Sequence, residues 1–205
     1  DVVWNGQRFE PHQGDMEKLL EDVSVLDFEP REGEDFFEEL KRHTEALGQV
    51  FGHEEDAAKL IADFDAAADR AKKAYDPEQK VMAVNTSGGE IGYIAPGIGR
   101  TYGPVFDLLG LKPALEVDNA SDDHEGDDIS VEAIAQSNPD WILIMDRDSA
   151  ISKEGEQVTP GEKLVKDNAA LKNVSAVKDG NVYVAPQDTY IDESIITYTE
   201  IPVSY

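Results

Sequence analysis

One stretch of the chain, residues 138–148, constrains the fold more than any other. Asn-Pro-Asp is a turn signal, and the apolar run Trp-Ile-Leu-Ile-Met after it predicts a strand covered on both faces. Such strands belong to parallel sheets that lie between layers of helices. The run ends in Asp146, Arg147 and Asp148, where ligands bind in open parallel sheets, so Arg147 is the first binding candidate. The competing interpretation is that Arg147 pairs with its two acidic neighbours at the surface.

The charge of the chain excludes several classes of partner. Among 205 residues, 44 are acidic and 18 are basic, which leaves a formal charge of −26. A field of this sign repels phosphate backbones and anionic membrane surfaces, so we expect no nucleic-acid partner. The chain has no cysteine, which excludes disulfides, thiolate catalysis and cysteine-bound zinc. No apolar run approaches the ~18 residues that a membrane-spanning helix needs.

Strand and helix patterns alternate along the rest of the chain. Residues 1–4 and 23–28 have strand patterns, and residues 16–22 have helical spacing. An amphipathic helix is expected at 34–51 with Gly52 as its stop, and a long alanine-rich helix at 54–75. From residue 80 onward, predicted strands at 80–85, 141–145 and 181–185 alternate with predicted helices at 101–109, from 130, at 164–168 and at 169–177. This order predicts an α/β fold with a mainly parallel sheet and helices on both faces.

Two further arginines lie in loops that follow predicted strands. Arg8 comes directly after the strand pattern of residues 1–4, and Arg100 precedes the helix expected at 101–109. Backbone N–H groups at a helix N-terminus already favour an anion, so Arg100 is a second binding candidate. A structural role, in which the guanidinium caps a loop carbonyl, is equally compatible. The glycine-containing loop at 86–90 is not a phosphate loop, because it has neither the GxGxxG spacing nor a Gly-Lys-Ser/Thr ending.

An acidic loop at residues 118–128 partly matches the calcium-binding template. Its Ser121, Asp123, Glu125 and Gly126, with Glu132 beyond, fall at positions one, three, five, six and twelve. The first ligand should be Asp and is Ser, so we interpret the match as coincidence.

At this point the order of motifs becomes familiar. A strand, the loop "NGQRF", a long helix, a strand, a Gly-rich loop with an arginine, "HEGDDIS", "NPDWILIMDR" and "VYVAPQDTY" follow one another. Nearly the whole chain resembles the substrate-binding proteins that deliver ferric siderophores to ABC importers, and within that class the catecholate-siderophore binders. The resemblance begins only near the end of that family's first lobe, so about the first third of a complete member is expected to be missing.

The resemblance implies a role for each of the three arginines. In catecholate binders, one arginine follows the last strand of the first lobe, and Arg8 matches it. A second lies in the loop before the first helix of the second lobe and matches Arg100, and a third ends the strand after an Asn-Pro-Asp turn and matches Arg147. Three guanidiniums around one cleft suit the anionic oxygen rim of a ferric catecholate.

Some members of the family also bind the iron directly through a histidine and a tyrosine, which resemble His124 and Tyr190. Imidazole and phenolate are both suitable ligands for ferric iron. The chain departs from the family pattern, because Glu125 separates His124 from Gly126 and the usual small residues do not follow Tyr190. On the residues alone, His124 is equally readable as a solvated loop histidine, and Tyr190 as a partly buried aromatic residue beside a strand end.

The resemblance also implies a domain organisation. Residues 1–52 are expected to be a remnant of an N-terminal lobe, 53–76 a linking spine helix and 77–205 a C-terminal α/β lobe. Without the rest of its sheet, the remnant is expected to expose an apolar patch and to self-associate through the unpaired strand at 1–4. The predicted patch consists of Val2, Val3, Trp4, Phe36, Phe37, Leu40 and Phe51.

The function implied is extracytoplasmic binding of a ferric siderophore and its delivery to an ABC transporter permease. Ferric iron would enter as the siderophore complex, with no intrinsic cofactor, and the protein would be periplasmic or a surface lipoprotein. Another iron chelate, haem or cobalamin is the alternative ligand within the same class. Two hypotheses belong to other classes. A small α/β enzyme would need a nucleophile elbow or a phosphate loop, and the sequence contains neither. An acidic interaction domain would show no metal chromophore on addition of a ferric catecholate.

Overall fold

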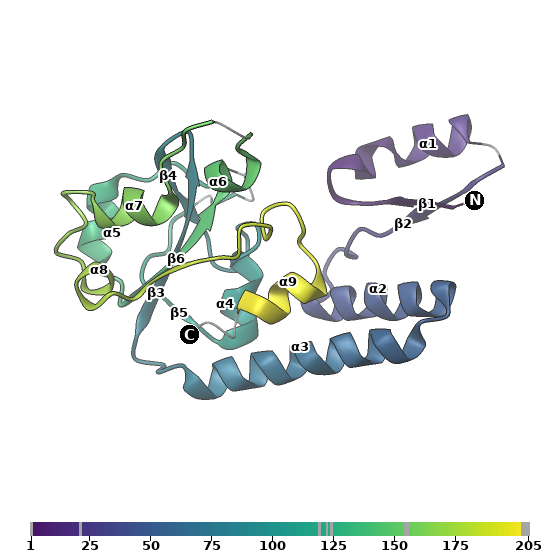
Figure 1. Cartoon of the computed structure of the whole chain (residues 1–205), viewed down its shortest axis with the longest axis horizontal. Helices are drawn as coiled ribbons and strands as arrows, with labels where there is room; N and C mark the ends of the chain where they lie inside the picture. Colours follow the sequence, from purple (N-terminus) through teal and green to yellow (C-terminus); the bar gives the residue numbers. More distant parts are fainter. Residues whose placement is uncertain are drawn as a thin grey trace. The chain divides into compact units, whose positions relative to one another are not determined.

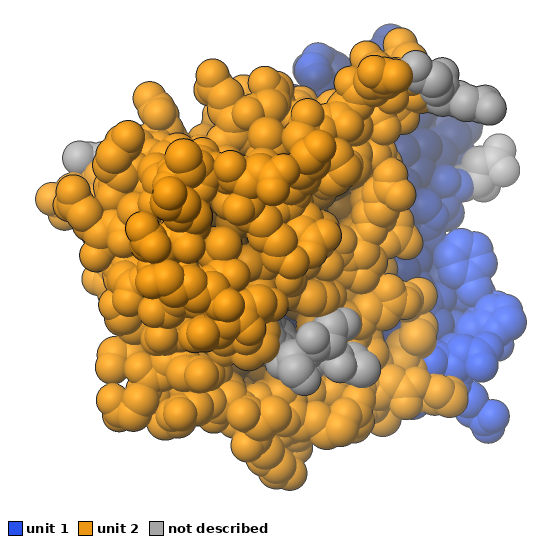
Figure 2. Space-filling view, turned by 60° about the vertical axis from the view of Figure 1, so that its left-hand side comes forward, with its two compact units in different colours: residues 1–58 blue, residues 59–205 orange. Residues whose placement is uncertain are grey.

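The computed structural model describes residues 2–20, 22–118, 120, 121, 123, 125–153 and 156–201. It divides into two units, Asp1–Ala58 and Lys59–Tyr205, coloured blue and orange in Figure 2. The boundary falls near the start of the long helix α3 (Glu54–Ala74). The three-part division after residues 52 and 76 stays a prediction. Among the described residues, no helix is both long and apolar enough to span a bilayer.

The smaller unit contains a parallel pair of short strands. β1 (Val2–Asn5) lies beside β2 (Ser24–Asp27), with Val2 opposite Ser24 and Asn5 opposite Asp27. The 3-10 helix η1 (Gln7–His12) and the helix α1 (Gln13–Leu19) connect the strands (Figure 1). The expectation that the first strand lacks a partner is therefore wrong, because β2 satisfies one of its edges.

Helix α2 (Phe36–Phe51) follows from local signals. Asp35 caps it by accepting a hydrogen bond of 2.9 Å from the backbone N–H of Glu38, and Gly52 ends it in the left-handed conformation with φ of 70°. The predicted exposed apolar patch is only partly present. Phe37 is buried, whereas Val2 and Phe51 are exposed and the remaining four members are half-buried.

The larger unit is built on a five-stranded sheet. Its order is β4-β3-β6-β7, with β5 beside the first part of β3. β3 (Lys80–Ser87) is parallel to β5 (Lys112–Pro113) and to β6 (Trp141–Asp146), which is parallel to β7 (Val182–Val184). Only β4 (Glu90–Ile94) is antiparallel, because it forms a hairpin with β3 through Gly88 and Gly89, both at positive φ. The mainly parallel α/β fold predicted from the sequence is confirmed.

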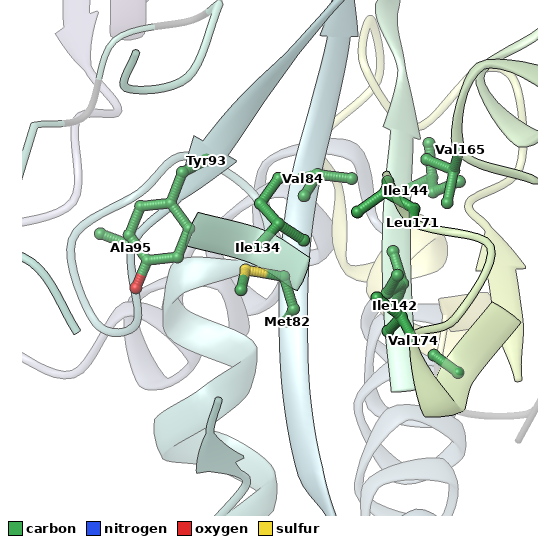
Figure 3. Close-up of a cluster of buried hydrophobic side chains, with 11 residues drawn as sticks. Met82, Val84, Tyr93, Ala95, Ile134, Ile142, Ile144, Val165, Leu171 and Val174 are labelled. Carbon is green, nitrogen blue, oxygen red and sulfur yellow. The ribbon is translucent and has the colours of Figure 1, made fainter. Parts of the chain in front are cut away.

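Helices cover both faces of this sheet. α5 (Val131–Ser137), α7 (Gly161–Lys166) and α8 (Ser175–Asp179) lie on one side, and α4 (Gly103–Leu109) and α9 (Ile195–Glu200) on the other (Figure 1). Side chains of β3 and β6 alternate between the faces. Met82, Val84, Ile142 and Ile144 point into a cluster with Ile134 and Val165 from the helices (Figure 3). Ala83 and Leu143, fully buried, point to the opposite face.

One predicted helix is wrong. The helix expected at residues 169–177 is replaced by turns, and α8 is helical only from Ser175. The side chain of Asn168 accepts a hydrogen bond of 3.0 Å from the backbone N–H of Ala170, which is a local alternative to helical pairing. In contrast, Ser130 caps α5 as expected from the sequence.

Candidate ligand site at the carboxyl ends of the strands

The candidate site lies where β3, β6 and β7 end in the larger unit. Ser87 is the last residue of β3, and Arg147 directly follows β6 as the first residue of the short helix α6 (Arg147–Ile151). Tyr190 lies in the loop after β7. Parallel strands bring their carboxyl ends to one edge of the sheet, so residues far apart in sequence meet there.

Arg147 makes three contacts at this edge. Its Nε atom donates a hydrogen bond of 2.9 Å to Tyr190 Oη, and its Nη1 atom donates one of 3.0 Å to Ser87 Oγ. The same Nη1 atom lies 3.7 Å from Glu125 Oε1, a carboxylate whose side chain is more than half exposed. The interpretation that Arg147 pairs with Asp146 and Asp148 is not what the structure shows.

Asp146 and Asp148 instead hold the backbone around the site. The buried carboxylate of Asp146 accepts hydrogen bonds from Ser149 N and Oγ, from Gly161 N and from Thr86 Oγ1, at 2.7–3.2 Å. The Asp148 carboxylate accepts one bond of 2.9 Å from each of Gly88 N and Gly89 N in the β3–β4 turn. Because both carboxylates are engaged, Arg147 is directed away from them towards Tyr190.

Arg100 approaches the same tyrosine. The guanidinium carbon of Arg100 lies 5.3 Å from the centroid of the Tyr190 ring, and that of Arg147 lies 5.6 Å from it. Both distances fall within the range of cation–π attraction. Tyr190 itself is buried, so the two predicted arginines and the predicted tyrosine of this unit form one cluster.

Glu193 is a member of the site that the sequence analysis did not identify. Its carboxylate, with 8% of the side chain exposed, lies 2.8 Å from Arg100 Nη2 and accepts a hydrogen bond of 2.8 Å from Arg100 Nε. The Oγ1 atom of Thr101 also donates to it. Burial, with the nearby charge of Glu193, raises the pKa of Tyr198 well above its usual range. No local pattern identifies Glu193, because its partner lies 93 residues away.

A small pocket lies between these side chains. Its cavity volume is about 10 Å³, which holds about one water molecule and is far below the roughly 300–1,000 Å³ of complete small-molecule sites. The lining combines two apolar side chains with polar and charged ones: Asn85, Ile94, Arg100, Thr101, Asp123, Met145 and Tyr190.

The remaining predicted site residues are not placed in this cluster. Arg8 falls in η1 of the smaller unit, and its side chain is not among those that the structure describes. His124 lies outside the described residues, although its neighbours Asp123 and Glu125 line the pocket and contact Arg147, respectively. Within the described ranges, no three acidic or histidine side chains converge as a metal site.

The fold is a mainly parallel α/β sheet, and charged and aromatic groups gather beyond its strand ends, where ligands bind in folds of this kind. The chain belongs to the periplasmic binding protein family, whose model matches residues 1–189. The resemblance found in the sequence is thus confirmed.

Two relatives have names that specify their ligands. The ferric-anguibactin-binding protein FatB of Vibrio anguillarum is 35% identical over 167 residues, 80% of this chain and 49% of that protein. The petrobactin-binding protein YclQ of Bacillus subtilis is 30% identical over 156 residues, 76% of this chain and 46% of that protein. Both are binding proteins rather than enzymes. The chain spans about half the length of the curated relatives it matches.

Solved structures show the same fold. The catecholate-siderophore binding protein VctP of Vibrio cholerae matches with a TM-score of 0.79 at 21% identity, over 98% of this chain and 69% of that one. The crystal structure of YclQ matches with a TM-score of 0.77 at 24% identity, over all of this chain and 70% of that one.

Proposed function

We propose that the chain binds a ferric siderophore, with catecholate groups among the iron ligands, outside the cytoplasm. The observation that carries this proposal is the cluster of Arg100, Arg147 and Tyr190 at the carboxyl ends of the strands. Guanidiniums present several N–H donors in a plane, which suits the oxygen rim of a ferric catecholate. Family membership and the named ligands of FatB and YclQ support the same ligand class.

Tyr190 has a second proposed role as an iron ligand, together with His124. A phenolate bound to ferric iron carries negative charge on Oη, and the Arg147 Nε that donates to this atom stabilises that charge. A tetradentate siderophore leaves two iron positions open for such protein ligands. A hexadentate siderophore leaves none, so Tyr190 and His124 would then contact only the surface of the ligand.

The transport role of the chain extends this proposal. The bound complex would be delivered to the permease of an ABC importer, and the chain would be periplasmic or held at the cell surface by a lipid. No catalytic role is proposed, because the relatives with matching sequences are binding proteins. Arg8 of the smaller unit is proposed as a third contact to the siderophore.

Titration of the intrinsic tryptophan fluorescence with ferric siderophores tests the function. We expect saturable quenching by ferric catecholate complexes and none by the iron-free siderophores at the same concentration. Quenching by haem, cobalamin or ferric citrate alone would establish another ligand of the same class and overturn the siderophore proposal.

A further inference from the structure

Glu193 forms an ion pair with Arg100 and so offsets its positive charge. Both contacts of 2.8 Å from Arg100, through Nε and Nη2, end on one oxygen of the Glu193 carboxylate. The other oxygen accepts from Thr101 Oγ1, so the carboxylate is held from two sides and is nearly inaccessible to water. Salt screens the attraction within a buried or partly buried ion pair only weakly. An anion arriving at the Tyr190 ring therefore meets an ion pair rather than an isolated guanidinium.

The positive charge of Arg147 is also partly offset by a nearby carboxylate. Its Nη1 atom lies 3.7 Å from Glu125 Oε1, and Asp123 lines the pocket beside Tyr190. These five side chains, two guanidiniums and three carboxylates, leave this part of the site one charge more negative than positive. The apolar lining residues Ile94 and Met145 add no charge. A strongly anionic ligand is therefore opposed here, whereas a ligand of low charge can use the guanidinium donors and the phenol ring.

We propose that Glu193 sets the charge that this site accepts, so that the chain prefers neutral or monoanionic ferric complexes to trianionic ferric tris-catecholates. This inference rests on the proposed function and specifies its substrate class. Mixed or incompletely saturated siderophores, in which catecholate is only one of the iron-binding groups, form complexes of the preferred charge. Glu193 acts through Arg100: it holds the guanidinium in position, and its negative charge offsets that of the guanidinium.

The test compares two ferric complexes of the same catechol chemistry on the 205-residue chain. One is the monoanionic complex of a tetradentate bis-catecholate, and the other is the trianionic complex of a hexadentate tris-catecholate. We expect the wild type to bind the monoanionic complex more tightly. Glu193→Gln keeps an oxygen acceptor for Arg100 and removes one negative charge, so it should shift the ratio of the two Kd values by about tenfold or more towards the trianion.

Two further variants separate this effect from changes in net charge and in folding. Glu200→Gln removes an exposed carboxylate from the same end of the chain and should leave the ratio unchanged. Glu125→Gln alters an exposed carboxylate near Arg147 and should shift the ratio in the same direction as Glu193→Gln, without a buried substitution. A tighter wild-type complex with the trianion, or an unchanged ratio in Glu193→Gln, overturns the inference while leaving siderophore binding intact. If Glu193→Gln does not fold, an unchanged ratio in Glu125→Gln overturns it. Failure of the wild type to bind any ferric siderophore overturns the proposed function and this inference with it.

Discussion

The Nε atom of Arg147 donates a hydrogen bond of 2.9 Å to the phenolic oxygen of Tyr190, across 43 residues of sequence. This bond connects the loop after β7 to the first residue of α6. The guanidinium carbon of Arg100 lies 5.3 Å from the centroid of the same ring, and Arg100 itself pairs with Glu193. Both cations are therefore close to the Tyr190 ring. The expected effects of substitutions follow from these contacts.

Replacement of Arg147 by alanine should weaken the binding of an anionic ferric catecholate by about 1.5–3 kcal/mol, because charge-assisted hydrogen bonds shielded from water are lost. Isothermal titration measures this change. Arg70→Ala removes the same charge from an exposed position on α3 and should have little effect. Equal losses in the two variants would show that only global charge matters.

Replacement of Tyr190 by phenylalanine should alter the charge-transfer band of the complex with a ferric bis-catecholate, because one proposed iron ligand is removed. His124→Ala should act on the same band. Both substitutions should change the spectrum much less when the siderophore is hexadentate and fills all iron positions itself. Tyr183→Phe, in β7 outside the pocket lining, is the matched control. An unchanged spectrum with the tetradentate ligand would disprove direct contact with the iron.

Replacement of Asp146 by alanine should lower the free energy of unfolding by about 2–4 kcal/mol, since it leaves the buried donors of Gly161 and Thr86 and the half-buried donors of Ser149 without their acceptor. Urea titration followed by circular dichroism measures the change. Asp179→Ala, at an exposed position at the end of α8, should change stability by less than about 0.5 kcal/mol. A loss below 1 kcal/mol for Asp146→Ala would contradict the framing role assigned to this carboxylate.

The stability of the smaller unit should fall in acid. Hydrogen bonds from Arg31 and then from Arg42 lower the pKa of Glu39 far below its model-peptide value of 4.5, so its contribution is complete above that value and is lost as the pH falls further. Burial, and then the charge of Arg42, lower the pKa of His43 below 6.5. A second loss of stability, smaller than that from Glu39, therefore begins as the pH falls below about 6.5. Thermal unfolding between pH 8 and 2 measures both.

Glu39→Gln should flatten the lower part of this pH profile, below about pH 4.5. Glu45→Gln, an exposed substitution on the same helix, should leave the profile of the wild type. If Glu39→Gln loses stability with pH as steeply as the wild type does, the carboxylate of Glu39 is not the source of the acid sensitivity.

The chain should self-associate through apolar side chains of the smaller unit. Val50 and Phe51 at the end of α2 are 56% and 61% exposed. The double substitution Val50→Ser with Phe51→Ser should shift the mass measured by light scattering towards the monomer. Ile151→Ser, which alters an exposed apolar residue of the larger unit, should not. A monomeric wild type at all concentrations would exclude this association.

The sequence alone determined the elements whose signals are local. The apolar run at 141–145 predicted β6, and Gly52 and Ser130 predicted an end of α2 and the start of α5. A strand end is also local, so Arg147 could be proposed as a site residue before its contacts were known. The helix expected at 169–177 was wrong: its first residues form turns, and the Asn168 side chain accepts a hydrogen bond from the Ala170 N–H, which is a local alternative to helical pairing.

Only the tertiary structure decided which side chains meet. Arg147 was expected to face its sequence neighbours, but Asp146 and Asp148 bind backbone N–H groups of distant segments, and Tyr190 receives the arginine instead. No local sequence pattern identified Glu193 as a site residue. Its partner Arg100 lies 93 residues away in the sequence, and the two meet only because the sheet order returns the chain to the same edge. Local patterns record the backbone preferences of a few residues, whereas ion pairs and hydrogen bonds between loops depend on the path of the whole chain.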